Sequence, residues 1–450
     1  MMMAAALGVL VSCGSVKSGE EAIAASRESK VVVAYVTSWS EVMPDPQYMT
    51  HINYAFGHVN ESFNGVKIDN EERLRQIVDL RKQKPELKVL LSIGGWGSGR
   101  FSEMAANDEY RRAFAADCDR VVKEFALDGI DIDWEYPTSS MANISSSPDD
   151  TENFTLLMQD IRAAIGNEKE LTLATVASAR YIDFKAILPS VDFVNIMAYD
   201  MASAPKHHSA LYPSGHSGDI TSDGAVTAHL KAGVPPSKLV MGMPFYGRGG
   251  DGYPSFQDYN KVGNTDTQYT EKWDEVAQVP YLADKNDTLV FGFENPRSLA
   301  IKCQYILDKD LLGGMYWDYS GDNEQGDLRR TVAENLLGKP HKAKVLVLTE
   351  RGGQHGGFTD AGLRWLAAEG VKGNFSITEI NNARNITEAY LSQFSLVIQL
   401  DFPPYTWPKE AEDAFVKYIE EGRGGWIGFH HATLLGEFDG YPMWQWFSDF

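Results

Sequence analysis

Three acidic side chains alternate with three large apolar ones in the segment 128–137, DGIDIDWEYP. The acids are Asp131, Asp133 and Glu135, and the apolar residues are Ile130, Ile132 and Trp134. Because successive side chains of a β-strand point to opposite faces, a strand here places the acids on one face, about 6.5 to 7 Å apart. Crowded carboxylates raise the pKa of at least one member, so the outermost, Glu135, can stay protonated near neutral pH. General acid catalysis on a glycosidic oxygen requires such a protonated carboxyl group.

The alternative for this acidic cluster is a divalent cation site, since calcium and magnesium prefer oxygen ligands. Such ligands usually come from a loop or from several elements, whereas these carboxylates lie on one interior strand. The pattern therefore favours acid catalysis, and we expect neither a metal ion nor a cofactor.

Aromatic side chains form a second group with chemical meaning. Tyr35, Phe56, Trp96 and Trp317 each lie at or near the end of a predicted strand. A single tryptophan in such a place usually belongs to the core. Four rings beside a carboxylate ladder favour a sugar-binding cleft, because the C–H faces of pyranose rings pack on aromatic rings.

These side chains need a scaffold that gathers strand ends. Eight short strand-like runs, several of them separated by helix-period segments, lie at 31–36, 51–56, 88–93, 129–135, 171–176, 192–199, 238–245 and 313–319. Eight strand–helix units over about 300 residues predict a (β/α)8 barrel, whose active site forms at the C-terminal strand ends. The alternative is a doubly wound parallel sheet, which would use fewer strands over a shorter span.

The chain resembles glycoside hydrolase family 18, the chitinase family, whose signature DGxDxDWEYP is matched in full at 128–137. The resemblance covers residues 31–335 and includes INYAF at 52–56, SIGGW at 92–96, MAYD at 197–200, PFYGR at 244–248 and MYWDYSGD at 315–322. It implies a retaining mechanism in which the 2-acetamido oxygen of the sugar, rather than a second carboxylate, attacks the anomeric carbon. The implied substrate is a β-1,4-linked oligomer or polymer of N-acetylglucosamine.

The resemblance also implies catalytic roles. Glu135 would protonate the leaving oxygen and then activate water. Asp133 would orient and charge-stabilise the acetamido group, and Asp131 would share a proton with Asp133. Tyr199 would hydrogen-bond the acetamido carbonyl.

Further positions resemble the family's sugar-binding residues. Asp200, Tyr246 and Arg248 match positions that bind the sugar around the scissile bond. Trp317 would lie beneath the cleaved sugar, Trp96 toward the leaving-group side, and Met197 would pack nearby.

Two other functions stay open: an endo-β-N-acetylglucosaminidase acting on N-glycan cores, and a chitinase-like lectin that only binds sugar. The DWEYP form and an insertion after Arg248 favour chitin-type substrates. Lectins of the family typically lose the acid, which is present here as Glu135. The formal net charge of -21 argues against a nucleic-acid partner.

The N-terminus predicts export. MMMAAALGVLVSCGS is apolar and rich in small residues, which is typical of a secretory signal and too short to span a bilayer as a helix. The residues before Cys13 resemble a lipobox, although no Lys or Arg precedes the apolar run. We expect a bacterial cell-envelope lipoprotein tethered through Cys13, or a secreted protein; an uncleaved tail is the alternative. Cys118 and Cys303 are expected to be buried free thiols rather than a disulfide.

A second strand–helix pattern follows the barrel. Predicted strands lie at 344–350, 375–380, 395–401 and 424–432, and predicted helices at 360–369 and 408–421. This order predicts a flavodoxin-like, doubly wound domain. Its last part resembles trehalose-utilisation-type domains, relatives of class I glutamine amidotransferases. The region has no cysteine, so the amidotransferase nucleophile is absent.

Three histidines of this region, His355, His430 and His431, either form a polar site at strand ends or serve structure, and no activity is assigned to them. A complete domain of this type would need further elements after the fourth strand, so we expect an incomplete one. The expected organisation is a signal segment and linker over 1–29, a barrel over 30–338 and a partial flavodoxin-like domain over 342–450. The barrel carries a small α+β insertion after its seventh strand, at about 249–295.

Overall fold

A computed structural model describes residues 30–250, 253–262, 268–337, 343–351, 355–373 and 375–450. The chain divides into two compact units, Met1–Gly338 and Lys339–Phe450. The predicted export signal and Cys13 lie outside the described residues. None of the described helices is long and apolar enough to cross a membrane.

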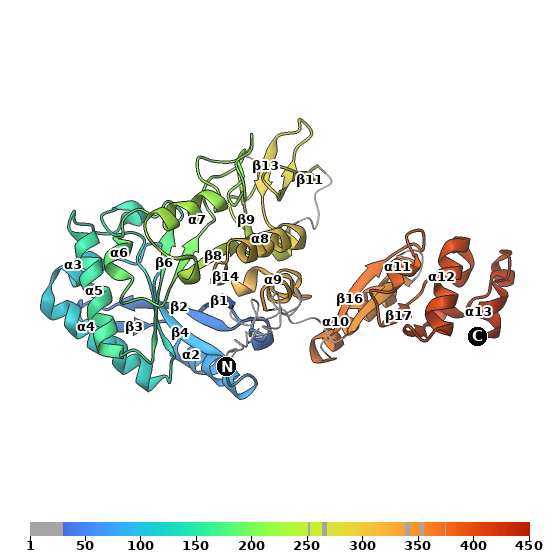
Figure 1. The fold of residues 1–450 in the computed structure, drawn as a ribbon, viewed down its shortest axis with the longest axis horizontal. Helices are drawn as coiled ribbons and strands as arrows, with labels where there is room; N and C mark the ends of the chain where they lie inside the picture. The colour runs from blue at the N-terminus through green and yellow to red at the C-terminus, as the bar shows by residue number, and fades with distance from the viewer. Residues whose placement is uncertain (1–29, 251–252, 263–267, 338–342, 352–354, 374) are drawn as a thin grey trace, which may run out of the picture. The chain divides into compact units, whose positions relative to one another are not determined.

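The first unit is a closed barrel of eight parallel strands (Figure 1). The strands are β1 (Val31–Thr37), β2 (His51–Val59), β4 (Lys88–Gly94), β5 (Gly129–Asp133), β6 (Glu170–Val176), β7 (Phe193–Met197), β8 (Leu239–Pro244) and β14 (Gly313–Trp317). Pairing of β1 with both β2 and β14 closes the ring, and the short β3 (Val66–Ile68) adds antiparallel to β2. The predicted (β/α)8 barrel is confirmed.

Helices surround this ring (Figure 1). They are α2 (Glu71–Val78), α3 (Phe101–Ala106), α4 (Asp108–Glu124), α5 (Asp150–Ile165), α6 (Phe184–Ile187), α7 (Ser222–Lys231), α8 (Pro296–Asp308) and α9 (Asp327–Leu337). Local sequence sets their starts: α8 opens with a proline, and the side chains of Asn295 and Ser298 cap each other's backbone N–H. Among the described residues, Cys118 of α4 and Cys303 of α8 are buried free thiols, as predicted.

The alternation along β5 separates two layers of side chains. Ile130, Ile132 and Trp134 are buried in the cluster between strands and helices. Trp134 stacks on Phe101 of α3, with ring centroids 5.3 Å apart. The acids occupy the opposite face of the strand, inside the barrel. They are directed there because the apolar side chains between them pack against the helices.

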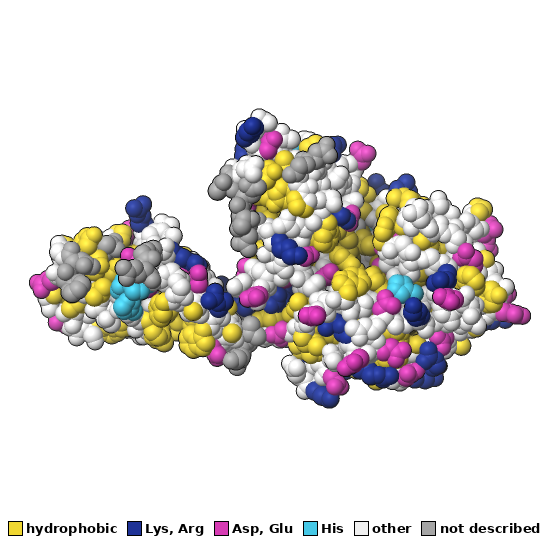
Figure 2. Space-filling model, turned by 180° about the vertical axis from the view of Figure 1, so that it is seen from behind, with side chains coloured by type: hydrophobic (Ala, Val, Ile, Leu, Met, Phe, Trp, Pro, Cys, Tyr) yellow, Lys and Arg dark blue, Asp and Glu magenta, His cyan; other side chains and the backbone are white. Residues whose placement is uncertain are grey.

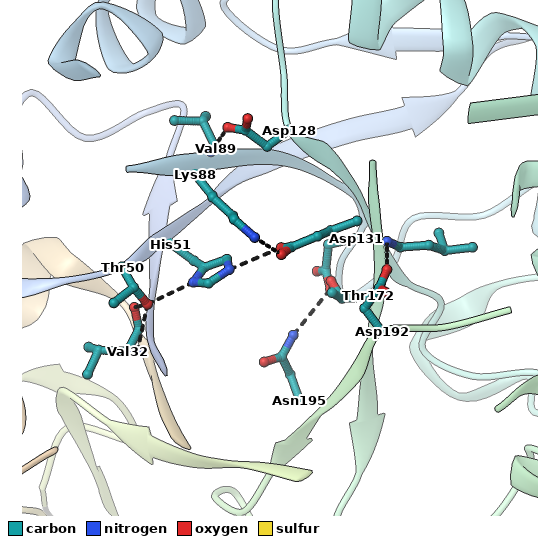
Figure 3. A network of polar contacts seen from close by, with 12 residues as sticks. Val32, Thr50, His51, Lys88, Val89, Asp128, Asp131, Thr172, Asp192 and Asn195 are labelled. Atoms are coloured by element: carbon teal, nitrogen blue, oxygen red, sulfur yellow. Dashed lines mark hydrogen bonds and ion pairs between the residues drawn. The ribbon is translucent and has the colours of Figure 1, made fainter. Parts of the chain in front are cut away.

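A polar network closes the N-terminal end of the barrel (Figure 3). His51 at the start of β2 lies 3.0 Å from the Glu170 carboxylate at the start of β6, and Lys88 of β4 pairs with the same carboxylate. Asp128, just before β5, accepts a hydrogen bond of 2.7 Å from the Val89 N–H. This network links the starts of β2, β4 and β6. It therefore fixes how these strands are shifted relative to one another, and so which of their side chains reach the C-terminal end of the barrel.

The insertion after the seventh barrel strand forms an antiparallel sheet in order β10-β9-β13-β12-β11. Its strands are β9 (Tyr246–Gly249), β10 (Gln257–Asp258), β11 (Thr270–Asp274), β12 (Val279–Ala283) and β13 (Leu289–Gly292). Its helical part, in the described residues, is one 3-10 turn, Tyr259–Lys261.

The second unit contains a parallel sheet in the order β16-β15-β17-β18. Its strands are β15 (Ala343–Leu348), β16 (Phe375–Ile380), β17 (Leu396–Gln399) and β18 (Gly425–Gly428), and its helices are α10 (Gly356–Gly373), α11 (Glu388–Leu391), α12 (Lys409–Glu420) and α13 (Gln445–Asp449). The parallel strands and intervening helices agree with the predicted flavodoxin-like arrangement.

Candidate active site

A cleft of about 680 Å³ lies at the C-terminal ends of the barrel strands. Its lining includes every site residue predicted from the sequence except Asp131, namely Tyr35, Phe56, Trp96, Asp133, Glu135, Met197, Tyr199, Asp200, Tyr246, Arg248 and Trp317. The residues come from segments more than 280 positions apart, and the closed ring of strands brings them together. The cleft therefore occupies the position at which barrels of this kind build active sites.

Asp131 lies beneath the cleft and is fully buried. Its carboxylate accepts hydrogen bonds from side chains of four other strands: Tyr35 Oη at 2.8 Å, Ser92 Oγ at 2.8 Å, Thr172 Oγ1 at 2.6 Å and Asn195 Nδ2 at 3.3 Å. Figure 3 shows it beside Thr172 and Asn195. Burial raises the pKa of Asp131, and these hydrogen bonds oppose that shift. The group is anchored across the barrel rather than aimed at a ligand.

Asp133, two residues on, is 4% exposed and borders the cleft. Burial, followed by the charges of Glu135 and Asp131, raises the pKa of Asp133 well above its ordinary value. Within the described part of the chain, its Oδ1 has no hydrogen-bond partner. A buried carboxyl oxygen without a partner can accept a proton or a donor group from a bound ligand.

Glu135 lies two residues beyond the end of β5, because the strand stops at Asp133 rather than at Glu135 as predicted. Burial raises the pKa of Glu135 to about 7, a hydrogen bond from Tyr136 opposes the shift, and the charge of Asp200 adds to it. The carboxyl group can thus be protonated near neutral pH while it faces the cleft, which is the state that a general acid needs.

This pKa leads to a pH prediction. Protonated Glu135 is the active form for donating a proton, so its population falls as the pH rises through about 7. We expect kcat/KM for oligosaccharide cleavage to decline above that pH, since this parameter reports the free enzyme. A pH–rate profile between pH 4 and 10 checks the position of the alkaline limb. A flat profile through pH 9 would contradict the assignment.

Two glycines let β4 end directly beside the acids. Gly94 has φ +133°, and a Cβ added there would lie 1.9 Å from the Asp133 carbonyl oxygen. The N–H of Gly95 donates to that same oxygen at 2.9 Å. A Cβ at Gly95 would meet the Phe56 ring at 2.7 Å. The two glycines of the SIGGW motif therefore allow the backbone of β4 to come close to the end of β5. Trp96, the next residue, lines the cleft.

An ion pair between Arg248 and Asp200 forms one wall of the cleft. The Arg248 guanidinium donates to both oxygens of Asp200, from Nε at 2.7 Å and from an η nitrogen at 2.6 Å. His208, which the sequence did not single out, is buried with Nδ1 3.4 Å from Asp200 Oδ1. Burial would raise the pKa of Asp200, but hydrogen bonds from Arg248 and His208 lower it below its ordinary value. Asp200 therefore remains ionised and can accept hydrogen bonds from a ligand.

Aromatic rings cover the floor and rim. The ring centroid of Trp317 lies 5.6 Å from those of Tyr35 and Phe56, and the ring planes of Trp317 and Phe56 are 22° apart. Trp96 is 62% exposed at the rim. Flat apolar surfaces in this arrangement suit the faces of several consecutive pyranose rings.

Sequence reasoning missed further aromatic lining residues. Trp39 is 63% exposed, Tyr136 stacks on Tyr181 at 5.5 Å, and Phe256 stacks on Tyr246 at 4.7 Å. Tyr136 directly follows Glu135 and could have been found from the signature. The others lie in loops, where the sequence carries no periodic signal.

Comparisons with known proteins agree with this geometry. Residues 31–322 match the family model described as glycosyl hydrolases family 18, and residues 344–450 match the model described as trehalose utilisation. Chitinase A1 of Niallia circulans is 29% identical over 68% of this chain, which spans 58% of that protein. Mouse chitotriosidase-1 is 31% identical over 66% of this chain, which spans 74% of that protein.

Solved structures resemble the barrel as well. A family 18 N-acetylglucosaminidase from Paenibacillus barengoltzii has 32% identity and a TM-score of 0.63, covering 68% of this chain and 100% of its own. The Ostrinia furnacalis group IV chitinase in complex with allosamidin has 29% identity and a TM-score of 0.61, covering 67% of this chain and 97% of its own. The chain belongs to glycosyl hydrolase family 18, with residues 31–322 as its chitinase-type hydrolase domain.

Proposed function

We propose that this chain hydrolyses β-1,4 bonds between N-acetylglucosamine units of chitin or chito-oligosaccharides, with retention at the anomeric carbon. The observation that carries the proposal is Glu135, a carboxyl group with a pKa of about 7 that lies beside Asp133 in an aromatic-lined cleft. Relatives named chitinase A1, group IV chitinase and chitotriosidase-1 support it.

Catalysis needs a single acid–base carboxyl group because the substrate supplies the nucleophile. Glu135 donates its proton to the glycosidic oxygen as the bond to the anomeric carbon breaks. The acetamido oxygen of the same sugar bonds to that carbon and forms an oxazolinium ion. Glu135, now a carboxylate, removes a proton from water as the water oxygen bonds to the anomeric carbon. The bond between that carbon and the acetamido oxygen breaks, which restores the acetamido group and leaves the hydroxyl with retained configuration.

Two neighbours act on the acetamido group. Asp133 accepts a hydrogen bond from the acetamido N–H through its buried Oδ1, which has no partner among the described residues. It also stabilises the positive charge of the oxazolinium ion. Tyr199 donates to the acetamido carbonyl oxygen; in the structure its hydroxyl donates weakly to the Met315 sulfur, at 3.8 Å. Asp131 positions Asp133 from below through their shared strand.

The remaining cleft residues bind the sugars. Trp317 supports the face of the sugar that is cleaved, with Met197 beside it, and Trp96 stacks on the leaving-group side. Asp200, Tyr246 and Arg248 hold hydroxyl groups around the scissile bond, because a bidentate ion pair keeps their polar atoms in place.

One assay tests this function against its alternatives. Purified protein is given chromogenic glycosides of chitobiose and chitotriose, and in parallel a glycoprotein with high-mannose N-glycans. Chromophore release without glycan release is the expected result, and product lengths by mass spectrometry separate internal cleavage from release of terminal sugars. Glycan release alone would instead show an endo-β-N-acetylglucosaminidase. Binding without turnover would show a lectin and overturn the hydrolase.

We also propose that Cys13 is lipidated and tethers the protein to a cell envelope, as the lipobox-like sequence before it suggests. Two acyl chains on one residue bury enough methylene groups for stable anchoring. Expressed in a bacterial host, the chain should incorporate labelled palmitate and sediment with membranes, whereas Cys13→Ser should do neither. Cys118→Ser is the matched control and should behave as the unmodified chain does. Unlabelled, soluble protein would contradict the tether.

A further inference from the structure

Three histidine side chains gather on the surface of the C-terminal unit (Figure 2). One ring nitrogen from each of His355, His430 and His431 lies within 4.8 Å of the other two. We propose that these residues form a binding site for a divalent transition-metal ion, and that zinc is the ion their chemistry selects. Neutral imidazole is a preferred ligand of zinc, whereas magnesium and calcium prefer oxygen.

The distance between the nitrogens fits this ion. His355 Nε2 and His430 Nε2 lie 3.4 Å apart. Two nitrogens bound to tetrahedral zinc at about 2.0 to 2.1 Å are separated by about 3.3 Å. The three ring centroids lie 4.3 to 4.6 Å from one another, so the third imidazole is within reach of the same point. A hydrogen bond between two imidazoles would use only one pair of these nitrogens and would leave the third ring unexplained.

The fold brings these histidines to the sheet edge at which such folds bind ligands. His355 follows β15, and His430 and His431 follow β18, at the carboxyl edge of the parallel sheet. In the order β16-β15-β17-β18, the direction of winding reverses between β15 and β17. Doubly wound sheets take their ligands at this reversal. His430, the first residue of the 3-10 turn His430–Thr433, has φ +48°, in the left-handed region.

A supporting carboxylate completes the arrangement. Glu350 Oε2 lies 3.2 Å from His431 Nδ1. When the Nδ1–H donates a hydrogen bond to this carboxylate, Nε2 carries the lone pair that can bind the metal, which is the usual carboxylate–histidine–zinc geometry. Such outer partners raise the basicity of the ligand and fix the orientation of its ring.

A fully buried aspartate holds both sides of this loop. Asp401 Oδ1 accepts from the Glu350 N–H at 2.7 Å, and Asp401 Oδ2 accepts from Thr359 Oγ1 at 2.5 Å. Thr359 lies in the first turn of α10, one helical turn after His355, and also donates to the His355 carbonyl oxygen at 3.2 Å. Asp401 therefore positions both the supporting glutamate and one of the three ligands.

The site would keep an open coordination position. Three protein ligands satisfy three of the four tetrahedral positions of zinc, as in zinc enzymes rather than in closed structural sites. His430 is exposed, and His355 and His431 are half-buried, so the fourth position faces solvent. Water or an oxygen-donor ligand such as a sugar hydroxyl would occupy it.

Zinc binding to the full-length chain tests the proposal. Protein made without a histidine tag is stripped with a chelator, dialysed, and titrated with zinc by calorimetry at pH 7.5. We expect one zinc per chain and no heat with magnesium. Chelation should leave chito-oligosaccharide hydrolysis unchanged, so failure of the metal site and failure of the proposed hydrolase give different results.

Single substitutions locate the ion. His430→Ala and His355→Ala should each weaken binding at least tenfold, and Glu350→Gln should weaken it about 10- to 100-fold through its effect on His431. His216→Ala, which removes an exposed imidazole of the barrel, is the matched control and should bind as the unmodified chain does. Circular dichroism verifies that each variant is folded. Absence of zinc binding, or equal affinity in all four variants, would overturn the site.

Discussion

Glu135→Gln should lower kcat for chito-oligosaccharide hydrolysis by about 10²- to 10⁴-fold, the range that a positioned general acid supplies. Glutamine keeps the shape and the hydrogen-bonding capacity of the side chain but cannot release a proton. Glu135 lines the cleft, but the aromatic rings that pack against the sugars are unchanged in this variant, so binding of allosamidin or of chitotetraose should be retained. Steady-state kinetics and calorimetric titration measure the two effects separately.

The choice of leaving group gives this variant a specific signature. Departure of a dinitrophenol needs little protonation, so single-turnover phenol release from a dinitrophenyl chitobioside should be far less impaired than cleavage of an oligosaccharide. The alkaline limb of the pH profile near 7 should also disappear. Glu152→Gln, at an exposed position in the first turn of α5, is a matched control and should retain full kcat. Full oligosaccharide turnover by Glu135→Gln would remove this residue from the acid–base role.

The fold could be predicted because the barrel repeats one pattern eight times. Apolar runs of β-branched residues separated by helix-period segments indicated each strand, and the observed strands begin within one residue of the predicted starts. The ends were harder to predict. Alternation along β5 continues to Trp134 and Glu135, but the ladder with β4 stops at Asp133 because the paired strand turns away at Gly94 and Gly95. A period of two shows which way a side chain faces and not where strand pairing ends.

The parts of the cleft that the sequence did not predict depend on tertiary placement. Trp39 and Phe256 lie in loops without periodic patterning, and His208 reaches Asp200 across a turn of the chain. Nothing local in the sequence marks such contacts.

For the histidines of the C-terminal unit, the sequence left two alternatives open, a polar site at strand ends or structural roles, and only the structure shows that the three rings lie together. His355 and His430 are 75 positions apart, and their proximity follows from the strand order β16-β15-β17-β18. The sequence predicted strands there but not their order in the sheet. We expected no metal ion from the acidic ladder, and the histidine cluster is the observation that leads us to propose one.

Asp133→Asn should be the second most damaging change, with kcat lowered by about 10²- to 10³-fold, the cost of removing one preorganised electrostatic contact to a developing charge. Asparagine fills the same buried volume, so the barrel should fold normally. It cannot become negative, and its amide group can turn an N–H toward the acetamido N–H of the sugar. The oxazolinium ion then loses both its acceptor and its counter-charge.

The two acidic variants should differ in their response to the leaving group. The Asp133→Asn defect lies in attack by the acetamido oxygen, which every substrate must undergo, so a dinitrophenyl leaving group should not restore the first turnover. Asp128→Asn is the matched control because Asp128 belongs to the same segment but caps the opposite end of the strand, bonded to the Val89 N–H. This control should lower thermal stability and leave kcat unchanged. Suppose instead that the better leaving group restored the first turnover of Asp133→Asn, as it does for Glu135→Gln. Asp133 would then assist proton donation, and this cleft would no longer support the acetamido oxygen as the nucleophile.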